Sequence, residues 1–196
     1  MSRIVLLARE FDRRLNELTS LEQEVNGVLL YRLQGRYCPI ETIYMTGLGT
    51  AGHVQASQNK LVTANEFFRR NPEYSCVKFH THSRGTIKIN EYYATHFSQA
   101  DINSYDNRLK EDADFIGMVV TPTTKLLYAP DNPTLRLVEG FPSEAEIRIN
   151  NELSQIALEL GQDTSRFTAR YSSHESTPPS RIHQLLDYLR TRLNRT

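Results

Sequence analysis

The chain has 196 residues, of which 39% are hydrophobic and 23% charged, and its formal net charge at pH 7 is zero. This balance is typical of a soluble protein with a sizeable core, and it gives no overall electrostatic attraction to nucleic acid or to an anionic membrane. Only two cysteines are present, Cys38 and Cys76, too few for a disulfide framework or a cysteine-based zinc site.

The N-terminal segment is charged and amphipathic. Apolar residues recur at helical spacing from Ile4 to Leu18, which predicts a helix over residues 3–19. Such a segment lacks the uncharged core of a signal peptide, and no apolar run in the chain approaches the length of a membrane span. We therefore expect a cytoplasmic protein that does not enter the membrane.

Strand and helix patterns alternate along the next part of the chain. Apolar runs bounded by turn residues predict strands at 25–31, 40–45, 76–82, 115–121, 125–128 and 135–138. A helix containing Leu61, Ala64 and Phe68 should stop at Asn71, which precedes a proline, and a second helix is predicted over 98–113. This order predicts an α/β (α+β) fold in which helices flank one mixed sheet.

The pattern changes after Pro142. A helical stripe of apolar residues ends before Gly161, formed by Ile149, Leu153, Ile156 and Leu160. Residues 162–180 are polar, as in a linker, and a last amphipathic helix carries Ile182, Leu185, Leu186, Leu189 and Leu193. We predict one domain over 1–141 and a C-terminal helical extension over 142–196, whose last helix packs on the domain, on a second copy of the chain or on a partner.

Two histidines mark the end of one predicted strand, in Phe79-His80-Thr81-His82. Because strand side chains alternate, both imidazoles point to the same side. Asp101 follows at the start of the next predicted helix, three residues after Ser98, which occupies the N-cap position. Two histidines and one aspartate leave a fourth coordination position open, as in catalytic zinc sites. We therefore predict that His80, His82 and Asp101 bind Zn²⁺.

Three segments together resemble the JAMM motif of the MPN (JAB/MPN/Mov34) zinc metalloproteases. They are Glu24-Val25-Asn26-Gly27-Val28-Leu29, His80-Thr81-His82 and Ser98-Gln99-Ala100-Asp101, in the family's order. The resemblance covers roughly residues 3–140. It implies a three-layer, cytidine-deaminase-like MPN/JAMM fold.

The resemblance also implies a role for each motif position. His80, His82 and Asp101 would be the zinc ligands, Glu24 the general base that activates a zinc-bound water, and Ser98 a donor to the oxyanion. The implied reaction is cleavage of an isopeptide or peptide bond after the C-terminus of ubiquitin or a ubiquitin-like protein, as in a deubiquitinase. In a prokaryote the corresponding substrate would be a ubiquitin-like sulfur-carrier protein or its conjugate.

The segment between the second histidine and the serine departs from the family pattern. Fifteen residues, 83–97, intervene, where family members commonly have fewer, and Ser83 replaces a frequent proline. The segment has no clean periodicity and contains Tyr92, Tyr93 and His96. It is either a flap that shapes the substrate channel or a surface excursion without consequence.

Several alternatives accompany this interpretation. Glu22 competes with Glu24 for the role of base, although only Glu24 has the family spacing to the glycine. His96 is either a further ligand or a solvated loop residue, and His53 and Cys76 are expected to be a surface residue and a small core residue. The chain as a whole could instead be a non-catalytic MPN-like interaction module, or a zinc hydrolase of a small amide or sulfur-carrier substrate.

Overall fold

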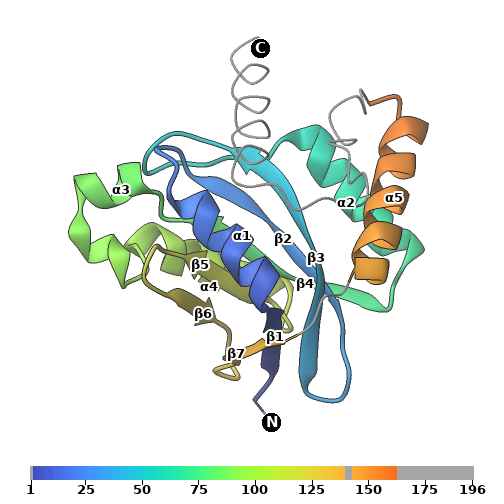
Figure 1. Cartoon of the computed structure of the whole chain (residues 1–196), viewed down its shortest axis with the longest axis horizontal. Coiled ribbons are helices and arrows are strands. Elements are labelled where there is room, and N and C mark those ends of the chain that lie inside the picture. The colour runs from blue at the N-terminus through green and yellow to red at the C-terminus, as the bar shows by residue number, and fades with distance from the viewer. Residues whose placement is uncertain (1, 140–142, 163–196) are drawn as a thin grey trace.

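The computed structural model describes residues 2–139 and 143–162 (Figure 1). Within them, strands form a seven-stranded sheet in the order β6-β5-β4-β2-β3-β1-β7. The strands are β1 (Ile4–Ala8), β2 (Val25–Arg32), β3 (Tyr37–Leu48), β4 (Tyr74–Thr81), β5 (Ile116–Val120), β6 (Lys125–Tyr128) and β7 (Thr134–Val138). The helices are α1 (Arg9–Thr19), α2 (Gln58–Arg70), α3 (Arg84–Ile89), the 3-10 helix η1 (Glu91–Ala94), α4 (Gln99–Glu111) and α5 (Ser143–Glu159).

The sheet is mixed, as the sequence predicts. Strand β2 lies antiparallel to both β3 and β4, and β5 lies antiparallel to β6. Parallel pairs join β4 to β5 and β1 to both β3 and β7. The mixed α and β architecture of the described residues confirms the predicted class.

Helices cover both faces of this sheet (Figure 1). Neighbouring residues of a strand point to opposite faces, and β2 shows this clearly: Leu29 packs in the cluster that contains Phe11 of α1, while Leu30 packs in the cluster that contains Phe67 of α2. Helix α5 shares the second cluster with α2. Helix α4 contributes Tyr105 to a third cluster, against β5.

The helix predicted over residues 3–19 is wrong over its first six residues. Residues Ile4–Ala8 form strand β1, and only Arg9–Thr19 is helical. β1 is hydrogen-bonded between β3 and β7 in parallel register, and four of its five side chains are buried. A strand covered on both faces is apolar without alternation, and such a run also satisfies a helical pattern.

The other elements lie close to their predicted positions, and two short helices are added in the segment 83–97. Helix α2 ends at Arg70 with Asn71 as its C-cap, as predicted, although its buried aromatic residue is Phe67 and not Phe68. Residues 83–97, which show no periodicity, contain the short helices α3 and η1.

The predicted domain boundary at residues 141 and 142 stays a prediction. Helix α5, which follows it, buries Ile149, Leu153 and Ile156 in the cluster that α2 and the sheet also form. Gly161 ends this segment at a φ of 68°, and the N–H of Gln162 donates to the carbonyl of Ala157. The predicted linker beyond residue 162 and the predicted last helix lie outside the described residues.

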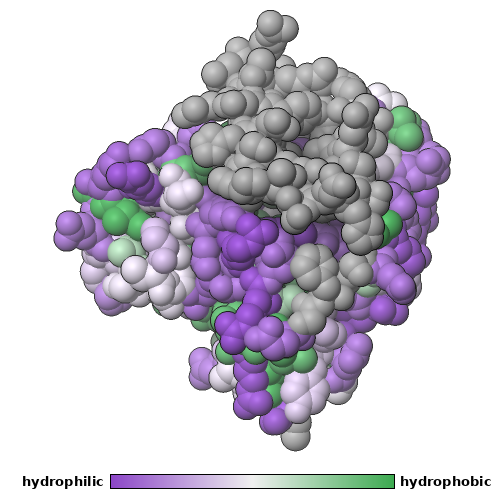
Figure 2. All heavy atoms as spheres, viewed as in Figure 1, coloured by the Kyte–Doolittle hydropathy of each residue, from purple (hydrophilic) through white to green (hydrophobic). Residues whose placement is uncertain are grey.

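The face in Figure 2 exposes mostly hydrophilic side chains among the described residues, and apolar side chains form small separate patches. Among residues 2–139 and 143–162, no helix combines the length and the apolar character that crossing a bilayer requires.

Replacing Leu153 by alanine should lower the free energy of unfolding by about 2–5 kcal/mol, because the change leaves a cavity in a closed core. Leu153 is 1% exposed, whereas Leu158 on the same helix is 54% exposed. The control Leu158→Ala should therefore change the free energy of unfolding by less than about 0.5 kcal/mol. Urea unfolding measures both variants, and equal losses would contradict the packing of α5.

Candidate metal centre

The pairing of β2 with β4 brings the first and second motif segments together. Asn26 lies opposite His80 in this antiparallel register. Glu24 directly precedes β2 and His82 directly follows β4, so continuing this register by two residues would set them opposite each other. Residues directly opposite each other share a sheet face, so Glu24, His80 and His82 belong to one face, the face that α4 covers.

His80, His82 and Asp101 form a compact group. One ligand atom from each residue can be chosen so that all lie within 4.8 Å of one another. His80 Nε2 is 3.0 Å from Asp101 Oδ1, and His82 Nε2 is 3.1 Å from Asp101 Oδ2. The three predicted ligands, which come from two elements, therefore meet at one point.

Asp101 is held in place by the start of α4. Its backbone N–H donates to the Ser98 hydroxyl oxygen at 3.1 Å, and its carboxylate accepts from the Ser98 backbone N–H at 2.7 Å, which together form a capping box. The predicted cap is thus confirmed. Since the cap uses an oxygen lone pair of Ser98, the hydroxyl proton stays available to donate elsewhere.

The hydrogen bonds of His82 define which ring nitrogen is free. Its Nδ1 lies 2.9 Å from the backbone carbonyl of Tyr93, and because a carbonyl only accepts, Nδ1 carries the proton. In a neutral ring Nε2 then has only a lone pair, yet Nε2 faces a carboxylate oxygen. Two acceptors at this distance require a positive charge, either a second ring proton or a cation bound by both.

The donor set fits a zinc ion. Two ligands of one tetrahedral zinc lie roughly 3.3 Å apart at the bond lengths that zinc prefers. Each imidazole has a similar separation from one carboxylate oxygen of Asp101, His80 from Oδ1 and His82 from Oδ2. Two imidazoles and a carboxylate also suit other first-row divalent metals. The described residues therefore provide a group that could hold a metal ion, whichever ion occupies it.

Charge interactions in the group favour the ionised forms. Burial alone would raise the pKa of the Asp101 carboxyl, but the hydrogen bonds of His80 and His82 hold that pKa well below its usual range. Burial alone would lower the pKa of His82, yet its bonds to Asp101 and Tyr93, with the nearby charge of Glu24, raise that pKa. The charge of Glu24 therefore acts on the group formed by His80, His82 and Asp101, which we call the metal group.

Glu24 is a buried carboxylate, 5% exposed, with a fixed orientation. The Thr86 hydroxyl donates to Glu24 Oε1 at 2.7 Å and accepts from the backbone N–H of Gly52 at 3.0 Å. The main chain of Glu24 is also bonded to the turn after β3, through Gly49 and Thr50.

The segment from Ser83 to Phe97 is attached at both ends. At its start, the Ser83 hydroxyl donates to the Glu22 carbonyl at 3.0 Å, and a Cβ on Gly85 would lie 2.2 Å from that same oxygen. At its end, the Ala94 carbonyl accepts from two threonine hydroxyls in the β5–β6 turn, at 2.7 Å each. Between these ends, Ile89 is 70% and Tyr92 55% exposed.

Other residues singled out from the sequence lie away from the metal group. Glu22 is exposed and pairs with Lys88. The His96 ring stacks on Tyr92, with centroids 3.9 Å apart, and His53 is an exposed turn residue. Burial raises the pKa of the Cys76 thiol to about 11, which fits a packing role.

Three further residues contact the site, of which only Tyr93 is singled out from the sequence, as part of the segment 83–97. Thr86 bonds to Glu24, the Tyr93 carbonyl bonds to His82, and the Tyr105 hydroxyl bonds to His80. Burial, with the charge of Asp101, raises the pKa of Tyr105 well above its ordinary value. Only Tyr105 carries a detectable signal, since it follows Asp101 by four residues and so shares its helix face.

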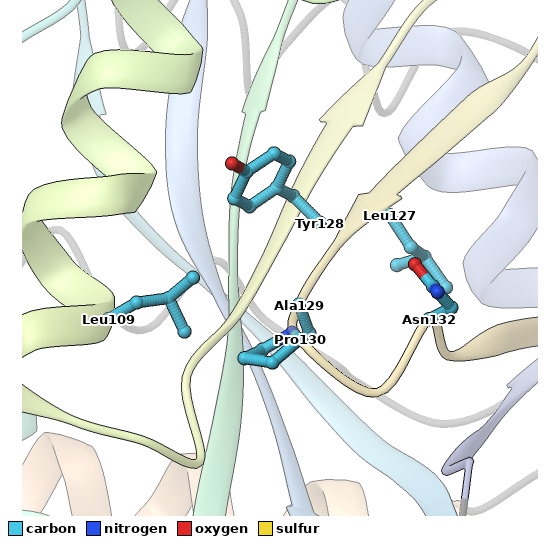
Figure 3. Close-up of a pocket in the computed structure, with 6 residues that line it drawn as sticks. All are labelled: Leu109, Leu127, Tyr128, Ala129, Pro130 and Asn132. Carbon is cyan, nitrogen blue, oxygen red and sulfur yellow. The ribbon is translucent and has the colours of Figure 1, made fainter.

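A shallow groove of about 290 Å³ lies at the other end of α4 (Figure 3). Leu109 faces it from the helix, and the residues from Leu127 to Pro130, with Asn132, complete its lining. Leu109 is two turns beyond Asp101, about 12 Å along the helix axis. The groove is therefore separate from the metal group.

Comparisons with known proteins add little. No family model matches the chain, and no curated protein matches it. Among solved structures, the chain is similar to the solution structure of protein DSY2949 from Desulfitobacterium hafniense, with 19% identity over 73% of this chain and 98% of that chain and a TM-score of 0.48. A likeness at this level carries no argument about the fold or the activity of this chain.

Removing one imidazole of the group should abolish tight metal binding. His82→Ala should weaken Zn²⁺ and Co²⁺ binding more than about 100-fold, because loss of an outer partner alone typically costs 10–100-fold. His96→Ala is the matched control, since His96 is exposed and outside the group, and it should bind like the wild type. Calorimetric titration of the metal-free proteins measures both, and equal affinities for the two variants would contradict this assignment.

Proposed function

We propose that this chain is a zinc-dependent hydrolase of the MPN/JAMM type. It cleaves isopeptide or peptide bonds that follow the C-terminus of ubiquitin or a ubiquitin-like protein. The observation that carries the proposal is the convergence of two imidazoles and a carboxylate, with a separate buried carboxylate, Glu24, whose charge acts on His82. The substrate class and the MPN fold rest on the resemblance of the motifs alone.

His80, His82 and Asp101 hold the zinc ion in this proposal. Bound zinc supplies a Lewis acid that acidifies a water molecule and polarises a carbonyl group. The three residues keep their donor atoms converged before the metal arrives, because the capping box fixes Asp101 and a backbone carbonyl fixes His82.

Glu24 acts as the general base. Its carboxylate accepts a proton from the attacking water and passes it to the leaving amine. The bond from Thr86 to Oε1 uses one acceptor site of the carboxylate, and its remaining lone pairs can accept the proton. A buried, fixed carboxylate loses little orientational freedom in this step, and correct placement of the base is worth large factors in rate.

Ser98 donates to the negative charge that develops on the substrate carbonyl oxygen. Its hydroxyl oxygen already accepts from the Asp101 backbone N–H at 3.1 Å, so the direction of the remaining O–H is restricted. Donors arranged in advance toward such a charge stabilise the transition state by a few kcal/mol.

Glu24→Gln should lower kcat by about 10²–10⁴-fold, because the amide cannot accept the proton, while zinc binding is retained. Glu22→Gln is the matched control, since Glu22 pairs with Lys88 at the surface, and it should keep full activity. The assay follows cleavage of a peptide fused to the C-terminus of a ubiquitin-like protein, with metal content measured in parallel.

Two outcomes would contradict the mechanism. Turnover by the wild type that persists after chelation and complete zinc removal would exclude the metal. Loss of activity in Glu22→Gln with normal activity in Glu24→Gln would exclude Glu24 as the base. If the zinc-loaded wild type cleaves no ubiquitin-like fusion, the proposed substrate class is wrong. The protein would then be a non-catalytic scaffold or a hydrolase of a small amide.

A further inference from the structure

The hydroxyl of Tyr105 lies between His80 and the backbone of β5. Tyr105 Oη is 3.2 Å from His80 Nδ1 and donates to the backbone carbonyl of Met118, also at 3.2 Å. The side chain is 6% exposed. One buried phenol thus connects a predicted metal ligand to the sheet.

Counting protons ties the direction of these bonds to the tautomer of His80. A phenol has a single hydroxyl proton, and the Met118 carbonyl can only accept. When that proton points to Met118, the phenol oxygen must accept from His80, so His80 Nδ1 carries the proton. His80 Nε2 then has its lone pair free, and this is the atom 3.0 Å from Asp101 Oδ1.

The same helix supplies both Asp101 and Tyr105. They are four residues apart on α4, one turn along the same face. Gly117 on β5 makes room for the Tyr105 ring, since a Cβ there would lie 2.8 Å from ring atoms. The ring also packs beside Phe115, with centroids 5.5 Å apart. The position of Tyr105 is therefore determined by the helix, the strand and the adjacent ring.

His82 has the same arrangement with a different partner. Its Nδ1 donates to the backbone carbonyl of Tyr93, which no side-chain substitution removes. Both imidazoles therefore turn Nε2 toward Asp101. Of the two supporting acceptors, only the one for His80 belongs to a side chain, so its contribution can be measured by substitution.

We propose that Tyr105 is a positioning residue for metal binding, which holds His80 in the tautomer with the proton on Nδ1 and so presents Nε2 to the ion. This inference rests on the metal site of the proposed function and is independent of the substrate. Outer partners of this kind commonly raise metal affinity 10–100-fold.

The test compares two tyrosine-to-phenylalanine variants from one aromatic cluster. Tyr105→Phe keeps the ring and removes the acceptor of His80, and it should weaken Zn²⁺ binding about 10–100-fold. Tyr128→Phe is the matched control, because its ring is 5.5 Å from that of Tyr105 but its hydroxyl donates to Asp106; it should bind zinc within about twofold of the wild type. Competition with a chromophoric zinc chelator measures the affinities.

A second measurement uses the wild type alone and so does not depend on whether a variant folds. In the zinc-loaded wild type, the imidazole ¹⁵N signals of His80 should show a proton on Nδ1 and the metal on Nε2. A proton on Nε2, or a Tyr105→Phe variant that binds zinc as tightly as the wild type, would overturn the proposal.

These outcomes are distinct from a failure of the proposed function. A wild type that binds zinc with the predicted dependence on Tyr105 but cleaves no ubiquitin-like fusion supports this inference and removes the proposed substrate. A wild type that is active while Tyr105→Phe binds zinc normally removes only the inference. A wild type that binds no zinc overturns both.

Discussion

The candidate metal centre depends on the register of β2 against β4. Antiparallel pairing places the start of β2 beside the end of β4, so the charge of Glu24 acts on His82 although the two residues are far apart in the sequence. A slip of one residue would turn both histidines to the opposite face. Val77 and Phe79, which alternate with the histidine positions and are 0% and 3% exposed in the core, oppose such a slip. The same burial that stabilises the sheet therefore aligns the site.

Much of this arrangement can be predicted from sequence, because the signals are local. The histidine pair at a strand end and the Ser98 to Asp101 cap each depend on a few adjacent residues, and the structure brings the three predicted ligands together. Strand β1 could not be separated from a helix, because parallel strands that are buried on both faces lose their alternation. The partners of the site residues depend on tertiary contacts: nothing near Thr86 in the sequence indicates that its hydroxyl reaches Glu24.

The histidines and the carboxylates of the site are each restrained by a second group. A carbonyl from η1, a phenol from α4 and a hydroxyl from α3 orient His82, His80 and Glu24 in turn. Two of these groups belong to the segment without periodicity, so that segment is part of the site and not a surface excursion alone. The segment contributes by restraining the side chains of His82 and Glu24.

The attachment of that segment at both ends has an evolutionary consequence. Ser83 and Ala94 are bonded to parts of the fold that do not include the exposed stretch around Ile89 and Tyr92. Substitution of the exposed side chains of Ile89 and Tyr92 therefore changes this surface while the Thr86 hydroxyl and the Tyr93 carbonyl keep their bonds to Glu24 and His82. For protein engineering, the exposed side chains of Ile89 and Tyr92 are places where recognition of a partner could be altered beside the candidate metal centre, provided that Thr86 and the backbone at Tyr93 stay in place.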